Sequence, residues 1–180
     1  MKKGVLILLV LLVLVISPAV FSEQEASHGL GKGEAGSSFY CLVMDMPRPE
    51  AGDVRYFITK CGEYTTWKLW PGKEKLFEGK EPHGALLTVY VNKIAFNSLD
   101  EKKGMQNGSM IVKENYTSDK KLAAVTVMYK SEKYNPEAGD WAWIKYDPDF
   151  NILAEGKVKE CIDCHSKAKD NDYILSGSIK

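Results

Sequence analysis

The chain has 180 residues, with 24 Lys and Arg against 24 Asp and Glu, so its formal net charge is zero. No basic stripe indicates a nucleic-acid partner, and no long run of like charges indicates an acidic or basic tail. The length suits one ordinary domain with its own hydrophobic core.

The first 22 residues have the pattern of a secretory signal peptide. Two lysines precede the unbroken apolar run Val5–Ile16, and mostly small residues follow it up to Ser22. The run is too short to span a bilayer comfortably, because a transmembrane helix needs about 20 apolar residues. An uncleaved membrane anchor remains the alternative, since Phe21 is an imperfect neighbour for a cleavage site. We therefore predict export to the periplasm and cleavage after Ser22.

The segment after the predicted signal peptide has a different composition. Residues 23–38 are rich in Gly, Ser, Ala and charged residues and contain almost nothing apolar. Such a composition predicts a flexible spacer. The folded domain is then expected over residues 39–180.

Two of the four cysteines, Cys41 and Cys61, lie in no recognisable motif. In an oxidising compartment a leftover pair of this kind is expected to form a disulfide. Closing such a loop stabilises the fold by roughly 3 kcal/mol in the chain-entropy estimate. We predict a disulfide with no redox function.

The domain is predicted to begin with one helix and to continue as strands. Apolar residues at helical spacing predict a helix from about residue 51 to 67. A second, short helix is expected around residues 95–102. Runs of β-branched and aromatic residues predict strands at 86–91, 110–112, 124–129, 141–146 and 152–154. The fold class is therefore α+β, mainly an antiparallel β-sheet with a few helices, and it lacks the long 3.6-period segments of a four-helix bundle.

The strongest motif lies near the C-terminus, at Cys161-Ile162-Asp163-Cys164-His165. This spacing is typical of c-type haem attachment, in which the two thiols add to the vinyl groups of the porphyrin and the histidine becomes the proximal iron ligand. The motif predicts one covalently bound haem c, with His165 as the metal ligand. Only 15 residues follow His165 and none is Met, so any sixth iron ligand has to come from upstream.

Three other uses of the Cys161–Cys164 pair compete with haem attachment. A thioredoxin-like redox pair is expected early in a strand-then-helix unit, far from this position. A zinc site needs two more ligands, which Cys41 and Cys61 could supply. A disulfide between Cys161 and Cys164 leaves His165 unexplained.

Four further segments, together with the haem motif, resemble the cytochrome P-460 and cytochrome c′-beta family. They are Pro82-His83-Gly84, Gly108–Tyr116, Gly139–Trp143 and Asp172-Tyr173. The resemblance implies a mostly antiparallel β fold, usually a homodimer, with a pentacoordinate haem whose distal side is open. It also implies a small ligand or substrate and a redox partner protein.

Lys113 is the candidate catalytic residue. The P-460 members of the family oxidise hydroxylamine and carry a lysine that is cross-linked to the porphyrin edge, and Lys113 matches the motif of that lysine. Strand alternation places Lys113 on the same side as Ser109 and Ile111. Both sides of this strand are mixed in polarity, so the sequence leaves open whether Lys113 reaches the haem or lies on the surface.

Leu87 and Val125 are predicted to line the distal side of the haem. In hydroxylamine-oxidising members of the family, the matching positions hold an arginine and an acidic residue. An apolar wall provides no general base for the protons that such an oxidation removes. It suits a small neutral diatomic, so the leading hypothesis is a protein that binds nitric oxide or carbon monoxide.

His83 adds a third hypothesis. It can ligate the iron from the distal side, bond a haem propionate, or cap a turn before Gly84. In the first case the protein is a six-coordinate electron-transfer cytochrome. Trp141 and Trp143 share one strand face, so one of them can pack on the porphyrin, although ordinary core packing is the favoured interpretation.

Overall fold

The structure, a computed structural model, describes Cys41 and residues 46–179. Its strands form one sheet in the spatial order β1-β3-β4-β5-β6-β7, with β2 also paired to β3. Every pairing is antiparallel, so the predicted antiparallel sheet is confirmed. The strands are β1 Lys68–Leu69, β2 Phe77–Glu78, β3 Leu86–Val91, β4 Met110–Tyr116, β5 Leu122–Lys130, β6 Trp141–Tyr146 and β7 Ile152–Gly156.

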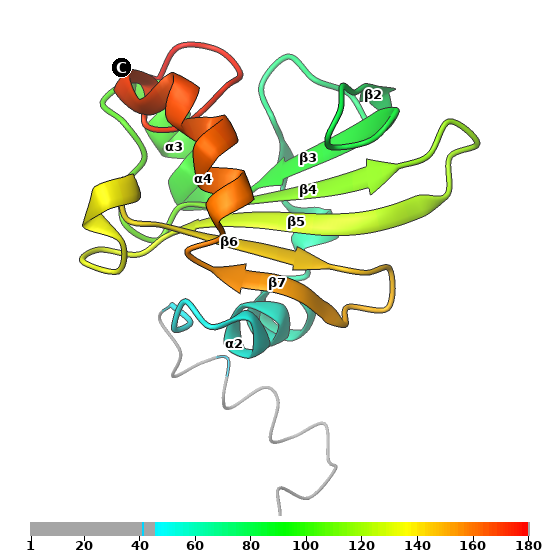
Figure 1. Ribbon diagram of the computed structural model, residues 1–180, viewed down its shortest axis with the longest axis horizontal. Helices are drawn as coiled ribbons and strands as arrows, with labels where there is room; N and C mark the ends of the chain where they lie inside the picture. The colour runs from blue at the N-terminus through cyan, green and yellow to red at the C-terminus, as the bar shows by residue number, and fades with distance from the viewer. Residues whose placement is uncertain (1–40, 42–45, 180) are drawn as a thin grey trace, which may run out of the picture. The chain divides into compact units, whose positions relative to one another are not determined.

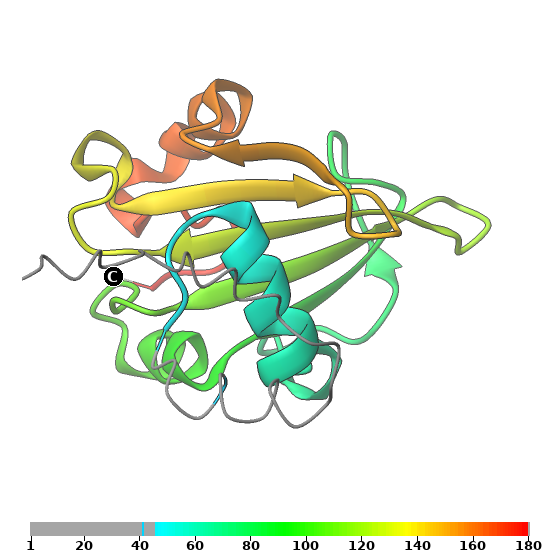
Figure 2. The same cartoon turned by 90° about the horizontal axis from the view of Figure 1, so that it is seen from below.

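The helices of the described residues lie on both sides of this sheet. The helix α2 is found below the sheet in Figure 1, and α4 above it, while Figure 2 shows α2 lying across the strands. The α-helices are α2 Ala51–Tyr56, α3 Lys93–Glu101 and α4 Lys159–His165. Short 3-10 helices occur at Tyr64–Thr66, Pro136–Ala138 and Ser166–Asn171.

Strand alternation divides the sheet into two faces with different partners. One face packs against α2, and a typical cross-strand row on it is Tyr90, Val112, Val127 and Ile144. The opposite face packs against the C-terminal segment, and the adjacent row there is Val91, Ile111, Met128 and Trp143. The second face is the one that meets the haem motif, because Cys161 and Ile162 pack against its cluster.

The first predicted helix is shorter than expected. The α-helical part of α2 ends at Tyr56, a π-helical turn follows at Phe57–Cys61, and the amide of Gly62 donates to the carbonyl of Phe57 at 2.7 Å. The indole of Trp67 then packs directly on Gly62 and donates to its carbonyl at 2.8 Å. The predicted continuous helix over 51–67 is therefore wrong, because this contact turns the chain after the π-helical turn.

The strand β4 is longer than its apolar part predicts. It continues past Val112 to Tyr116, because the polar side chains in this stretch find partners on the two faces of the sheet. Glu114 accepts hydrogen bonds from the hydroxyls of Tyr64 (2.9 Å) and Tyr116 (2.8 Å) on the α2 face. A buried carboxylate is tolerated when it is hydrogen-bonded in this way.

Cys41 and Cys61 form a disulfide, as predicted. The predicted signal peptide, residues 1–22, and the spacer, 23–38, lie outside the described residues. No helix in the described part of the chain has both the length and the apolar character that a membrane span requires.

Asn92 joins three elements next to the sheet. Its side-chain oxygen accepts from the amides of Ala95 at the start of α3 (2.9 Å) and Met110 at the start of β4 (3.1 Å). Its amide nitrogen donates to the carbonyl of Gly108 at 2.8 Å. The side chain is almost fully buried, so each of these backbone groups depends on Asn92 for a partner.

We expect Asn92→Ala to lower the free energy of unfolding by about 2–4 kcal/mol, because it removes a helix cap and leaves buried backbone groups unpaired. Chemical denaturation followed by circular dichroism measures the effect. The matched control is Asn97→Ala on the exposed side of α3, expected to stay within about 0.5 kcal/mol of the wild type. Equal stability of the two variants would contradict this account of Asn92.

Candidate haem site

The haem motif lies on the short helix α4. Cys161, Cys164 and His165 are spaced three and four residues apart, so they share one side of the helix. Both cysteines are partly buried free thiols, and His165 is buried. The zinc alternative is excluded for Cys41 and Cys61, because these two are bonded to each other. The helix therefore presents two thiols and one imidazole on one side, as covalent haem attachment would require.

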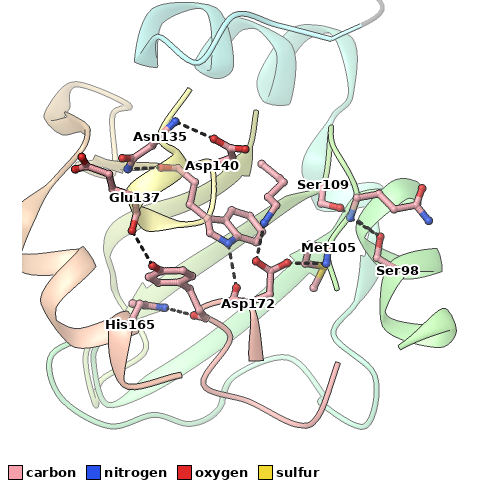
Figure 3. Close-up of polar contacts among 12 residues, drawn as sticks. Ser98, Met105, Ser109, Asn135, Glu137, Asp140, His165 and Asp172 are labelled. Atoms are coloured by element: carbon pink, nitrogen blue, oxygen red, sulfur yellow. Dashed lines mark hydrogen bonds and ion pairs between the residues drawn. The ribbon is translucent and has the colours of Figure 1, made fainter. Parts of the chain in front are cut away.

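A backbone carbonyl fixes the orientation of His165. The Nδ1 of His165 lies 2.7 Å from the carbonyl oxygen of Tyr173 (Figure 3). A carbonyl only accepts, so Nδ1 carries the proton and Nε2 keeps its lone pair. Burial, the largest effect, lowers the pKa of His165, which keeps the ring neutral. A neutral imidazole with Nδ1–H bonded to a carbonyl and Nε2 free is the usual state of a metal-binding histidine.

His83 lies close to His165. The two ring centroids are 6.3 Å apart and the ring planes cross at 83°. Burial, followed by the charges of Lys113 and His165, lowers the pKa of His83 to about 4, so this ring is also neutral at pH 7. Two neutral imidazoles from distant parts of the chain therefore meet at one place.

Asn115 determines which nitrogen of His83 is free. The side-chain amide nitrogen of Asn115 donates to the carbonyls of Lys113 (3.0 Å) and Ala124 (3.1 Å) and to the hydroxyl of Thr126 (3.2 Å). These acceptors fix the amide orientation, so the oxygen of Asn115 faces His83 Nδ1 at 3.2 Å. Nδ1 must donate to this oxygen, which leaves Nε2 of His83 with a free lone pair.

Lys113 lies on the same face of the sheet. In the cross-strand register it stands between Val89 and Thr126, beside Asn115. Burial lowers its pKa to about 8, and the thiol of Cys164 acts in the opposite direction. The charge of Lys113 also lowers the pKa of both His83 and His165. Lys113 therefore lies on the face of the sheet that meets the haem motif, near the thiol of Cys164.

The structure separates the two residues predicted to line the distal side. Leu87 is buried and pairs with Asn115 in the register, so it lies on the haem-motif face. Val125 is completely buried on the opposite face, in the core under α2. The predicted place of Val125 beside the haem is wrong, and its neighbour Thr126 takes that side because alternate residues of a strand face opposite ways.

The buried indole of Trp143, next to His165, bears on whether a haem fits this site. Trp143 is 3% exposed, and its ring centroid lies 6.4 Å from that of His165. Its Nε1 is the only buried side-chain nitrogen or oxygen in the described residues without a hydrogen-bond partner. A bound group with an acceptor, such as a carboxylate of haem, would satisfy this N–H, so the residues present fit haem. Trp141, by contrast, donates to the carbonyl of Asp172 at 3.0 Å and is ordinary core.

Three groups of the site could not be recognised from the sequence: Asn115, Thr126 and the carbonyl of Tyr173. Asn115 sits inside a strand, where its amide has no sequence signal of its own. The carbonyl of Tyr173 is backbone, which no side-chain motif marks. The described residues contain no group of three or more His, Cys, Asp or Glu side chains that could hold a bare metal ion.

A family of known proteins matches most of the described residues. The family model described as Cytochrome P460 matches residues 63–176, which include every residue of the site. A search of curated proteins finds no match. The matched segment covers more than half of the chain and contains the haem motif, so the protein belongs to the cytochrome P460 family and is a c-type haem cytochrome.

Proposed function

We propose that this protein is an exported electron-transfer cytochrome with a six-coordinate haem. Cys161 and Cys164 hold one haem c covalently, and His165 and His83 bind its iron from opposite sides. The observation that carries the proposal is the pair of neutral imidazoles 6.3 Å apart, each with Nδ1 bonded and Nε2 free. When bound, haem supplies an iron that exchanges one electron between its ferric and ferrous states.

The separation of His83 and His165 fits a shared metal. Metal–imidazole bonds are about 2 Å long, so two rings that bind one metal on opposite sides have centroids roughly 6 Å apart. The observed 6.3 Å matches the separation that two imidazoles on one iron would have. Hydrogen bonds from Nδ1 to Tyr173 and Asn115 hold both rings, which limits the rearrangement that electron transfer requires.

Binding of nitric oxide or carbon monoxide has less support than electron transfer. It rests on an apolar distal wall of Leu87 and Val125, and Val125 faces the other side of the sheet. Leu87 keeps its place on the site face, but the other groups there near His83 are polar, namely Asn115, Lys113 and Thr126. A gas ligand therefore has to displace His83 from the iron, and it binds more weakly than to an open site.

Lys113 gives specific support to a second candidate, a hydroxylamine-oxidising enzyme. A cross-link to the porphyrin edge requires an uncharged amine, and burial lowers the pKa of Lys113 to about 8. About a tenth of the amines are then uncharged at pH 7, far more than for a lysine with its ordinary pKa. If His83 is not a ligand, its neutral ring is also available as a general base.

Export to the periplasm is part of the proposal. The Cys41–Cys61 disulfide supports it, because disulfides persist in oxidising compartments. A redox partner protein that accepts or delivers the electron follows from the proposed activity. A homodimer remains a proposal that rests on the family resemblance.

The variant His83→Ala tests the ligand assignment. We expect the wild type to show the visible spectrum of a six-coordinate, low-spin haem, and His83→Ala to become five-coordinate and high-spin, because the variant lacks the second imidazole. The matched control is Lys80→Ala in the same loop, which is exposed and should keep the wild-type spectrum. A high-spin wild type whose spectrum does not change in His83→Ala would show that His83 is not a ligand.

Peptide mapping distinguishes the two candidates at Lys113. After proteolysis, electron transfer without a cross-link predicts that the Lys113 peptide is released separately from the haem peptide of Cys161 and Cys164. Hydroxylamine oxidation by the wild type should then be no faster than by Lys113→Met. Recovery of Lys113 joined to the haem peptide, together with hydroxylamine turnover that the variant loses, would instead establish the enzyme.

A further inference from the structure

We propose that the ion pair between Lys130 and Asp172 is a positioning device for His165, and that it holds the haem reduction potential low. Neither residue belongs to the haem motif. They act through the carbonyl of Tyr173, which accepts the hydrogen bond from His165. The inference rests on His165 as a haem ligand, which is part of the proposed function, but it does not depend on His83.

The contacts of Asp172 hold it in place from three directions (Figure 3). Lys130 Nζ, at the end of β5, lies 2.6 Å from Asp172 Oδ1, and both side chains are mostly buried. The amide of Met105 donates to Asp172 Oδ2 at 2.7 Å, and the indole of Trp141 donates to the Asp172 carbonyl at 3.0 Å. The ammonium of Lys130 also lies over the ring of Trp141, 4.9 Å from its centroid.

The backbone at this point needs such support. Asp172 and Tyr173 have φ angles of 53° and 64°, so two successive residues with side chains adopt the left-handed conformation. This conformation is unfavourable for residues other than glycine, because their Cβ atom comes too close to the following carbonyl oxygen. Tyr173 is held further by its amide, which donates to Ala168 (2.8 Å), and by its hydroxyl, which donates to Glu137 (3.1 Å).

This conformation aims the Tyr173 carbonyl at His165 Nδ1, 2.7 Å away. A strong hydrogen bond from Nδ1–H makes the imidazole a better electron donor to iron. A better donor stabilises the ferric state more than the ferrous state and so lowers the reduction potential. If the ion pair is removed, the carbonyl has more freedom, the bond to His165 weakens and the potential rises.

The ion pair is not explained by stability alone. A buried ion pair is often no more stabilising than an apolar pair of similar volume, whereas removal of one partner leaves an unpaired charge. The informative change is therefore the double variant Lys130→Met/Asp172→Asn. It removes one charge of each sign, so the net charge near the haem stays the same. The amide side chain that replaces the carboxylate retains an oxygen that can accept from Met105.

Two measurements on the haem-loaded double variant test the proposal. We expect spectroelectrochemistry to give a more positive reduction potential than for the wild type. We expect nuclear magnetic resonance of histidine-labelled protein to show a weaker hydrogen bond at His165 Nδ1–H. The matched control is Lys121→Met/Asp119→Asn, which removes an exposed ion pair of 2.7 Å in the β4–β5 turn and should change neither quantity. A folded double variant with an unchanged potential and an unchanged Nδ1–H resonance would overturn the proposal.

If the double variant does not fold, the single variant Lys130→Gln tests the proposal instead. Lys130→Gln keeps a donor for Asp172 but removes a positive charge. Loss of that charge through space makes reduction harder and moves the potential down, whereas a loosened Tyr173 carbonyl moves it up. A positive shift, with Lys130→Arg restoring the wild-type potential, supports the positioning role, and a negative shift contradicts it. A high-spin wild-type spectrum shows separately that the His83 assignment has failed.

Discussion

The alternation of side chains along β4 is the constraint on which the site depends. Val112 and Glu114 point to α2, while Lys113 and Asn115 point to the haem motif. Consecutive residues of β4 thus contribute in turn to the hydrophobic core and to the candidate haem site. Glu114 can lie on the core face only because Tyr64 and Tyr116 donate to its carboxylate. The register of β4 with β3 and β5 therefore sets both the packing and the chemistry.

Both imidazoles are oriented in the same way, by a hydrogen bond from Nδ1–H to an oxygen acceptor. His165 donates to the backbone carbonyl of Tyr173, and His83 donates to the side-chain oxygen of Asn115. Each of these acceptors is fixed in turn. The side chain of Asn115 donates to three acceptors. The Tyr173 carbonyl is fixed by its left-handed backbone and by the contacts of the neighbouring Asp172. A haem protein tunes its iron through such outer contacts as well as through the ligands themselves. Both sides of the site are built to hold a neutral ring in one orientation.

Much of this architecture could be predicted from the sequence because it has local signals. The haem motif, the β-branched runs and the leftover cysteine pair identify the sheet, the proximal helix and the disulfide. Val125 shows where such reasoning fails, since an error of one residue in register moves a side chain to the opposite face. Lys113 could not be assigned a face because Glu114, also polar, is accommodated on the core side by tyrosines distant in sequence. Tyr173 orients His165 through its backbone carbonyl. Every residue type has this group, so the sequence carries no signal for the role.

In the proposed cytochrome, the imidazoles of His83 and His165 share one iron. Electron paramagnetic resonance of the ferric wild-type protein, with detection of nitrogen hyperfine couplings, tests it most directly. Because the rings of His83 and His165 cross at 83°, the account predicts a strongly anisotropic low-spin signal with couplings from two imidazole nitrogens. A high-spin signal with coupling to a single imidazole would contradict it.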